Sequence, residues 1–258
     1  MTCNLHKQEA INRTQAIDFF SNYATTLLSS GATSLRTETN IGRMAEFYNI
    51  KVIITIMPKH VQIMLTMGDE SVVRVVSRTM GINFYSITEL SRLSWRVVEE
   101  RLDVATANKI LEEIKSKKRC HIAIVTIMAG LANASFCRLF GGDYWAMFFV
   151  LIATISGFYT KHELVNKIGI DARIATIFAA SISSVLSCGA SMYGLGNTPE
   201  VSLATSVLYL VPGIPYINAF SDLINGHHIC ALSWLISALE TTICLGTGLV
   251  LGNYLLNL

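Results

Sequence analysis

The sequence has little charge. Aspartate, glutamate, lysine and arginine together make up 15% of its 258 residues, whereas 52% are hydrophobic and the mean hydropathy is +0.47. A soluble domain usually carries about 25% charged residues. The charges also favour one half, because residues 1–119 hold 16 Lys+Arg and 12 Asp+Glu, while residues 120–258 hold 4 and 6. We therefore expect a soluble domain over residues 1–119 and a membrane domain over residues 120–258.

Several kinds of functional site are also missing. The six cysteines form no C-x-x-C pair and have no histidine at ligand spacing, so we expect neither a disulfide nor a metal site. The sequence has no glycine-rich phosphate loop, no Ser/His/Asp constellation and no nucleic-acid-binding signature. We therefore predict no enzyme activity, no cofactor and no nucleic-acid partner. The first ten residues are polar, which argues against a cleaved signal peptide.

The first half has the pattern of a small α/β module. Apolar residues recur at three- and four-residue steps from Ile11 to Leu28, which predicts an amphipathic helix ended by Gly31. A second helix is expected to start at a Ser34 cap. Three β-branched runs separated by turn residues predict an antiparallel sheet. These runs are Lys51–Met57, Val61–Met67 and Ser71–Ser77.

Two further helices complete this half. The run Ser86–Glu89 has the spacing of a capping box and predicts a helix to about Glu100. Asp103 is expected to cap the next helix, which ends in a basic cluster at residues 115–119. Arg74 and Arg78 would share one strand face, where solvated charge is the expected environment.

The second half contains five apolar segments that are long enough to cross a bilayer, since a spanning helix needs about 17–25 residues. They are His121–Phe140, Tyr144–Thr160, Ala172–Leu195, Val201–Ser221 and Ile229–Leu256. Lysine and arginine concentrate in cytoplasmic loops. With the first half in the cytoplasm, seven such residues near the segment ends lie inside and only Arg138 lies outside. The N-terminus is then cytoplasmic and the C-terminus lies outside.

The fourth apolar segment is interrupted. It carries no charge from Val201 to Ser221 but holds Pro212–Pro215 in its middle. Proline removes a backbone donor and clashes with the carbonyl one turn earlier, so the helix must kink or unwind. Freed backbone groups are tolerated in a membrane only against protein or a wet cavity. Asn218 and Asp222, one turn apart after the break, therefore suggest a transport site. The alternatives are a kink for packing alone and, for Asp222, a solvated helix end.

Two other features mark the membrane half. Small residues at four-residue steps in the third segment, together with Gly248 and Gly252 in the fifth, predict close helix packing. Glu240 lies near the middle of the fifth segment, where an ionised carboxylate costs at least about 2.5–3.5 kcal/mol. We expect Glu240 to be protonated, paired or facing a cavity, and a proton-relay role is a hypothesis that depends on this cost. Apart from Arg138, no cationic side chain is expected inside the spans.

A set of short motifs runs along the chain. They are Asn197-Thr198-Pro199, Leu210–Ala219, Asp222, Gly226-His227, Ser30-Gly31-Ala32 with Arg36 and Glu38, Ile82-Asn83, and Phe136–Leu139 before Gly141-Gly142. In these motifs the chain resembles the threonine/serine exporter family. The resemblance points to six residues that would bind substrate or gate its passage, and Glu240 is not one of them. The six are Asn197, Pro212, Gly213, Pro215, Asn218 and Asp222.

The resemblance also implies an assembly. Longer members of that family have a soluble N-terminal domain and twice as many spans, so this chain is similar to the long subunit of a split, two-gene type. In that type a small membrane subunit supplies the remaining spans, and succinate export from bacteria is the associated activity. We therefore expect an inner-membrane exporter of small carboxylates, such as succinate or threonine/serine-like amino acids. It would contact membrane lipid and be driven by protons through Glu240 or Asp222.

A second interpretation stays open. A cytoplasmic domain of 119 residues is larger than transport requires, and it would suit a membrane-anchored regulator that senses a ligand without transporting it. The two interpretations differ in one respect. Pro212→Ala and Asn218→Ala should abolish export by an exporter, whereas a regulator should tolerate both.

Overall fold

The computed structural model describes residues 13–68, 70–79, 81–117, 120–189, 195 and 197–256. The chain is mostly helical and divides into two compact units, residues 1–118 with 216–235, and residues 119–215 with 236–258. The first division falls beside the predicted domain boundary, but residues 216–235 join the N-terminal unit. Whether the units are the functional domains stays a prediction. The polar first ten residues lie outside the described part of the chain.

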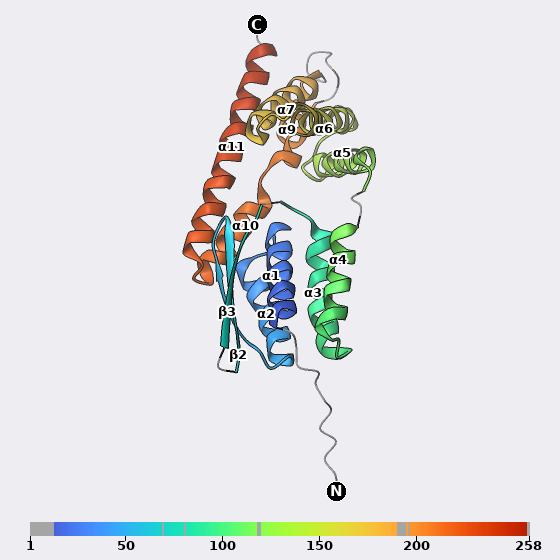
Figure 1. Cartoon of the computed structure of the whole chain (residues 1–258). Helices are drawn as coiled ribbons and strands as arrows, with labels where there is room; N and C mark the ends of the chain where they lie inside the picture. The colour runs from blue at the N-terminus through green and yellow to red at the C-terminus, as the bar shows by residue number, and fades with distance from the viewer. Residues whose placement is uncertain are drawn as a thin grey trace. The chain divides into compact units, whose positions relative to one another are not determined.

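The first unit combines helices with a small sheet (Figure 1). It also contains most of α10 (Gly213–Ile224) and the start of α11 (His228–Leu256). Its other elements are α1 (Arg13–Ser29), α2 (Ser34–Phe47), β1 (Lys51–Ile56), β2 (His60–Met67), β3 (Glu70–Ser77), α3 (Phe84–Glu99) and α4 (Val104–Ser116). The helices and strands of the predicted α/β module are thus present.

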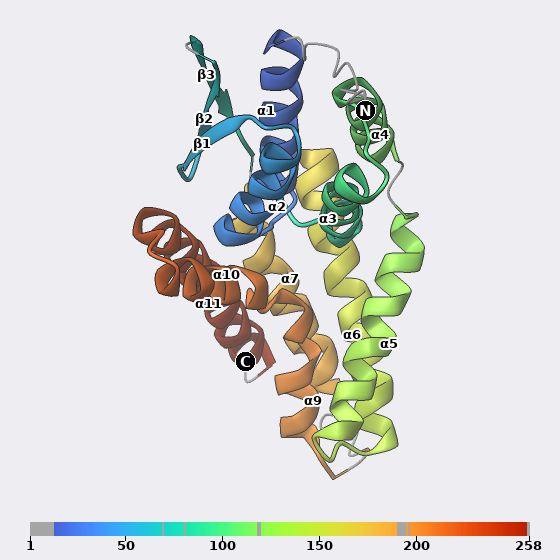
Figure 2. The ribbon, with the colours of Figure 1, turned by 90° about the horizontal axis from the view of Figure 1, so that it is seen from below.

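Helix α1 lies at the centre of the first unit, with the sheet on one side and α3 and α4 on the other (Figures 1 and 2). Its side chains Phe19, Phe20 and Tyr23 are fully buried. Burying a large apolar side chain contributes about 1.5–3 kcal/mol, so this helix supplies much of the core. The Tyr23 hydroxyl donates to the Leu90 carbonyl at 2.8 Å and accepts from Asn40 at 3.0 Å.

The three strands form an antiparallel sheet in the order β1-β2-β3, as predicted. Along β2, Val61, Ile63 and Leu65 alternate toward α1 and are buried. The other face is open, because Val73 and Val75 of β3 are exposed. One covered face and one open face is the usual arrangement of an antiparallel sheet.

Two helix starts differ from the prediction. The side chain of Thr33, and not that of Ser34, caps α2 by accepting from the Arg36 amide. Asn83 caps α3 by accepting from the Ser86 amide, so Ser86 lies inside the helix. In both cases an earlier residue has a side-chain oxygen and the extended backbone that an N-cap requires. Asp103 caps α4 as predicted.

Arg78 is buried, which contradicts the expected solvated position. Its Nε donates to the carbonyls of Met57 and Pro58 at 3.1 and 2.9 Å, so it fastens the β1–β2 turn. Burial lowers the pKa of its guanidinium. Arg74, by contrast, is half exposed and pairs with Asp18 on the surface.

The second unit is a helical bundle. Helix α6 lies at its centre and packs against α5, α7 and α9. The second unit also contains α11 from Ile236 onward. Its other elements are α5 (Ile122–Leu139), α6 (Tyr144–Glu163), a π-helical turn (Leu164–Ile168), α7 (Ala172–Ser187), α9 (Pro199–Ser206) and a 3-10 turn (Leu208–Leu210).

Polar side chains link the helices of this bundle. Asn133 of α5 donates to the Thr154 hydroxyl of α6 at 3.1 Å, and Thr154 donates to the Ser206 carbonyl of α9 at 3.3 Å. Ser183 of α7 donates to the Ala153 carbonyl at 3.0 Å. Such hydrogen bonds are a common means of joining helices in an apolar environment.

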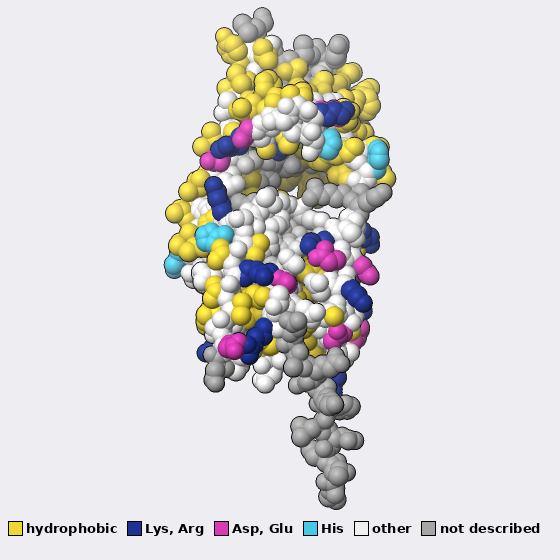
Figure 3. Space-filling view, viewed as in Figure 1, with side chains coloured by type: hydrophobic (Ala, Val, Ile, Leu, Met, Phe, Trp, Pro, Cys, Tyr) yellow, Lys and Arg dark blue, Asp and Glu magenta, His cyan; other side chains and the backbone are white. Residues whose placement is uncertain are grey.

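Two described helices are long and apolar enough to cross a membrane, Ile122–Leu139 and His228–Leu255. A third span results if Pro199–Leu210 and Gly213–Ile224 count as one helix broken by a 61° bend. Helix α7 is apolar but has only 16 residues. The predicted five spans therefore stay a prediction. In Figure 3, hydrophobic side chains cover much of the visible face of the second unit, while charged side chains are scattered over the first.

Candidate functional site

The predicted break lies at Val211-Pro212. Val211 has the extended backbone that a residue before proline adopts, and α10 begins directly afterwards at Gly213. Pro215 falls in the first turn of α10, where its missing N–H is not needed. The 61° bend confirms the predicted kink and places it between Leu210 and Gly213, at Val211-Pro212.

Asp222 is completely buried on the inner face of α10 and is not a solvated helix end. Its carboxylate accepts two hydrogen bonds from Ser34, one from the backbone N–H at 3.0 Å and one from the hydroxyl at 3.1 Å. Ser34 is the first residue of α2, so the carboxylate pairs with an N–H that has no partner within the helix. The position also places a negative charge at the positive end of the helix dipole.

Asn218 is buried one turn before Asp222 and binds the same loop. Its side-chain amide donates to the Gly31 carbonyl at 2.9 Å. Gly31 has φ +91°, and a Cβ at this position would lie 2.9 Å from the Gly81 carbonyl oxygen. We call Ser30, Gly31, Ser34, Asn218 and Asp222 the Gly31 junction, because they join α10 to the loop between α1 and α2.

Further contacts surround the Gly31 junction. His227 lies 3.3 Å from the Glu38 carboxylate, and the Asn83 amide donates to the Ser30 carbonyl at 2.9 Å. The Cys230 thiol donates to the Ile56 carbonyl at 3.4 Å. The junction thus unites motif residues that are nearly 190 positions apart in the chain. Helix α10 is held to the first unit by its polar face.

Asn197 lies in the second unit at a different junction. Its backbone N–H donates to the Asp143 carboxylate at 2.6 Å, and the Asp143 N–H donates to the Thr198 hydroxyl at 3.0 Å. Asp143 also caps α6 by accepting from the Ala146 amide at 2.7 Å. Hydrogen bonds from the Ala146 and Asn197 amides hold the pKa of Asp143 below its usual range. The chain before α9 is therefore fixed to the loop between α5 and α6.

Glu240 was expected to be protonated, ion-paired or facing a cavity. In the structure it is ion-paired and lies beside a cavity. Its carboxylate lies 3.4 Å from a guanidinium nitrogen of Arg173. Together with Lys161, Ser237 and Thr241, these residues line a cavity of about 300 Å³ between α6, α7 and α11. The two cations are Lys161 and Arg173, which the lysine and arginine count places near the segment ends on the cytoplasmic side. That no cation other than Arg138 lies inside the spans stays a prediction.

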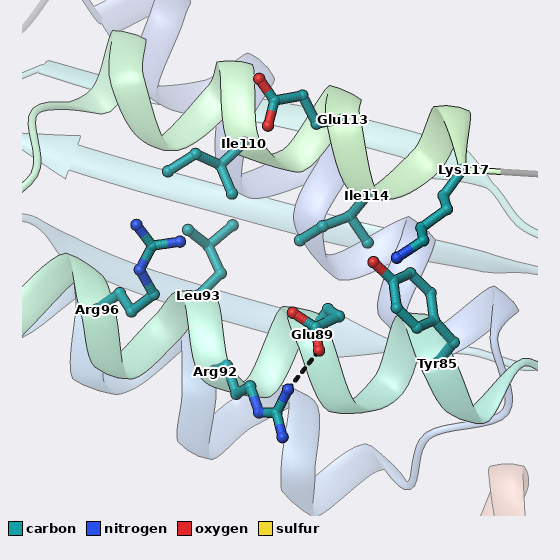
Figure 4. A pocket seen from close by; sticks show the side chains of 9 residues that line it. All are labelled: Tyr85, Glu89, Arg92, Leu93, Arg96, Ile110, Glu113, Ile114 and Lys117. Atoms are coloured by element: carbon teal, nitrogen blue, oxygen red, sulfur yellow. Dashed lines mark hydrogen bonds and ion pairs between the residues drawn. The ribbon is translucent and has the colours of Figure 1, made fainter.

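A second cavity, of about 330 Å³, lies between α3 and α4 in the first unit (Figure 4). Leu93, Ile110 and Ile114 point toward one another across it. Most of its charged groups are engaged locally, since Arg92 pairs with Glu89 at 2.6 Å and Lys117 lies over the ring of Tyr85. Arg96 is likewise held by two hydrogen bonds to Glu100. We interpret this groove as the solvent-exposed boundary between two packed helices.

The sequence singled out Asn218, Asp222 and the break but gave no sign of their partners, and a functional role for the two residues stays a prediction. Nothing in the local sequence relates Asp222 to Ser34, because the two meet only in the folded unit. The same holds for Asp143 with Asn197 and for Arg173 with Glu240. Within the part of the chain that the structure describes, no group of histidine, cysteine and acidic residues could hold a metal ion.

Comparison with known proteins now decides the family. Residues 18–256 match the model of the family described as "Putative threonine/serine exporter". The chain belongs to the threonine/serine exporter family. The resemblance found in the motifs is thereby confirmed. No solved structure matches the chain.

The relatives carry two different names. The "Probable succinate transporter subunit YjjP" of Escherichia coli (strain K12) is 30% identical over 176 residues, which cover 66% of this chain and 67% of that protein. The protein of the same name in Klebsiella aerogenes is 30% identical over 171 residues, with 64% and 65% covered. The "Probable threonine/serine exporter" of Mycobacterium tuberculosis is 25% identical over 244 residues, 92% of this chain but only 45% of that protein. The chain thus spans less than half the length of the mycobacterial relative.

Proposed function

We propose that this chain is one subunit of a bacterial inner-membrane exporter of small carboxylates, either succinate or threonine/serine-like amino acids. The observation that carries the proposal is the broken helix at Pro212, whose second half is held by the Gly31 junction. Family membership points in the same direction. A helix with a fixed break and a buried polar face is suited to moving as a gate.

In the proposed gate, the Gly31 junction holds α10 in place. Asn218 and Asp222 engage the loop before α2, so a change at that loop would release α10 or hold it. At the other end, Asn197 is fixed by Asp143, which anchors the chain before α9. In this proposal Pro212, Gly213 and Pro215 form the pivot. The first turn of α10 presents the partial positive charge of a helix N-terminus to a passing carboxylate.

A small membrane subunit completes the exporter. We propose five spans in this chain, with the N-terminus in the cytoplasm and the C-terminus outside, as the lysine and arginine distribution indicates. An odd number of spans allows a related partner to sit inverted, which is a common transporter plan. Two relatives are named as subunits, which supports a partner. The proton gradient would drive export through Glu240 or Asp222.

Efflux measurements test this proposal. Cells or inverted vesicles are loaded with labelled threonine or labelled succinate, with this chain alone, with the small subunit alone, and with both. We expect export of one of the two compounds only when both chains are present, and we expect a protonophore to abolish it. Absence of export of either compound from the complete pair would contradict the proposed function.

The regulator interpretation has one feature in its favour, the groove between α3 and α4 (Figure 4). Four of its five charged side chains, those of Glu89, Arg92, Arg96 and Lys117, already have partners on their own helices or on the neighbouring one. A ligand would have to displace these contacts to bind. The exporter is therefore the function that the geometry supports best.

A further inference from the structure

Pro212 changes the chain before the break as well as after it. Proline has no N–H, so the Leu208 carbonyl loses the donor that a continuous α-helix would supply four residues later. The chain tightens into the 3-10 turn Leu208–Leu210, and the Leu208 carbonyl accepts from the Val211 N–H at 3.1 Å. A short 3-10 turn has poorer hydrogen-bond geometry than an α-helix, so this end depends on its neighbours for support.

Helix α6 supplies part of that support. In a continuous helix the Ser206 carbonyl would accept from Leu210, but the Leu210 N–H donates to Val207 at 2.9 Å. The Thr154 hydroxyl donates to the freed Ser206 carbonyl at 3.3 Å, and both residues are completely buried. An unpaired carbonyl is costly in apolar surroundings, so this bond stabilises the end of α9 against α6.

Tyr209, the middle residue of the 3-10 turn, lies against both α6 and α7. Its hydroxyl is 3.1 Å from the Ser183 hydroxyl of α7. Ser183 donates its one proton to the Ala153 carbonyl at 3.0 Å, so Tyr209 is the donor to Ser183. The ring of Tyr209 packs against that of Phe158 in α6, with the centroids 5.8 Å apart. The side chain thus joins the turn to both helices.

Gly157 of α6 provides the space for the tyrosine hydroxyl. A Cβ at Gly157 would overlap with the hydroxyl oxygens of Tyr209 and Ser183, and would lie 2.9 Å from the Ala179 carbonyl oxygen. A larger residue would therefore displace Tyr209 or separate α6 from α7. We call Gly157, Ser183 and Tyr209 the Tyr209 dock. All three belong to the second unit.

We infer that Tyr209 is a positioning residue, which fixes the end of α9 so that the chain turns at Val211-Pro212. The inference rests on the proposed export function, to which it adds the side of the break that stays fixed. In the proposed gate, α10 moves about Pro212 while α9 remains docked on α6 and α7. Without the Tyr209 dock, the end of α9 would follow α10, and less of each movement would open or close the passage.

Export by the complete pair tests the inference. Tyr209→Phe keeps the ring and removes only the hydroxyl, while Ser183→Ala removes its hydrogen-bond partner. Maximal rates are compared at equal amounts of folded protein, for whichever of labelled threonine and labelled succinate the native pair exports. A neutral hydrogen bond is worth a factor of about two to ten, so each variant should lower the maximal rate by that factor. The half-saturating substrate concentration should stay within about twofold of the native value.

The double variant Tyr209→Phe/Ser183→Ala identifies the shared bond. It should export no more slowly than the slower single variant, because both changes remove the same hydrogen bond. Tyr254→Phe is the matched control, since Tyr254 is 62% exposed on α11, and it should export at the native rate. Gly157→Ala should slow export at least as much as Tyr209→Phe, because it displaces the ring as well. If Gly157→Ala does not fold, the tyrosine and serine variants decide alone.

Three results would overturn the inference and leave the proposed function intact. They are native export by Tyr209→Phe, a half-saturating concentration that rises as much as the rate falls, and losses that multiply in the double variant. A native pair that exports neither compound would instead contradict the proposed function. Melting temperatures of the same variants then test the Tyr209 dock by itself. A double variant no less stable than the weaker single variant would support the dock, and additive losses of stability would contradict it.

Discussion

At the scale of single residues, Gly31 is restricted both in its backbone conformation and in the space around it. Its φ of +91° is unfavourable for any residue with a side chain, and an added Cβ would lie 2.9 Å from a backbone carbonyl oxygen. Its own carbonyl accepts from Asn218. The residue therefore sets the shape of the loop to which α10 is bound.

Gly31→Ala should destabilise the first unit by about 1–3 kcal/mol, the usual cost of a strained backbone position. Gly42→Ala is the matched control, because nothing lies within 4 Å of a Cβ placed at Gly42, inside α2. It should stabilise the chain by about 0.5–1 kcal/mol, since glycine is a poor helix residue. Urea unfolding of the full chain in detergent, followed by circular dichroism, measures both. Equal effects would contradict the strained geometry.

Asp222→Asn should weaken the Gly31 junction. The carboxylate accepts two hydrogen bonds from Ser34 at a completely buried position, one on each oxygen. An asparagine side chain has only one acceptor oxygen and carries no negative charge. We expect a loss of about 1.5–3 kcal/mol, as for hydrogen bonds to charged groups.

Asp18→Asn serves as the control for that experiment. Asp18 pairs with Arg74 on the surface, where ion pairs contribute about 0–1 kcal/mol. Both variants are compared by the same unfolding titration. A cost for Asp222→Asn no greater than that for Asp18→Asn would show that the junction does not stabilise the fold.

At the scale of elements, α11 and α7 approach closely along small residues. A Cβ at Gly248 would lie 2.5 Å from the Ile177 carbonyl oxygen, and one at Gly252 would lie 2.6 Å from the Ser184 Cβ. The Ser181 hydroxyl donates to the Gly248 carbonyl at 3.0 Å. The predicted packing of the small residues is therefore confirmed.

Gly248→Ala should separate the two helices, because a backbone carbonyl cannot move aside cheaply. Overpacking of this kind costs about 1–3 kcal/mol. Gly246→Ala, two residues earlier with open space around its Cβ, should have little effect. Thermal unfolding of the two variants in the same detergent makes the comparison. Equal melting temperatures would show that the helices do not pack as described.

The loop that begins α6 should respond to acid. Hydrogen bonds from the Ala146 and Asn197 amides lower the pKa of Asp143, so folding favours its ionised form. The stabilisation is then fully present above the pKa of an unfolded aspartate, about 3.9, and is lost as the pH falls through the lower folded value.

Asp143→Ala isolates that acid response. The variant should lose the cap, at a cost of about 0.5–2 kcal/mol near neutral pH, and it should approach the stability of the native chain as the pH falls below about 4. Melting temperatures between pH 3 and 7 test this. A constant difference between the two proteins over that range would contradict the role of the carboxylate.

At the scale of the whole molecule, local features were predictable from the sequence. The end of α1 at Gly31, the cap at Asp103, the sheet and the break at Pro212 all depend on neighbours a few residues away. Even there, the caps at Thr33 and Asn83 were missed, because adjacent residues compete for the same role. Burial of Arg78 was missed because it depends on a turn some 20 positions earlier.

The long-range contacts were not predictable, because they join distant parts of the chain. Asn218 and Asp222 were recognised as unusual, but their partners lie 187 and 188 positions away. The hydropathy pattern placed Glu240 near the middle of the fifth segment. The structure shows that α11 begins in the first unit and enters the second at Ile236, so that Glu240 lies only four residues beyond this point. Its pairing with Arg173 follows from that arrangement.

The most direct test of the account is the export rate of the complete pair when the chain carries Pro212→Ala. Pro58→Ala, in the turn between β1 and β2, is the control. Restoring a backbone donor at the break should favour a straight helix, so we expect export to fall at least about tenfold, equivalent to about 1.4 kcal/mol, at equal amounts of folded protein. The control should export at the native rate. Native export by Pro212→Ala would contradict the claim that the broken helix is the gate.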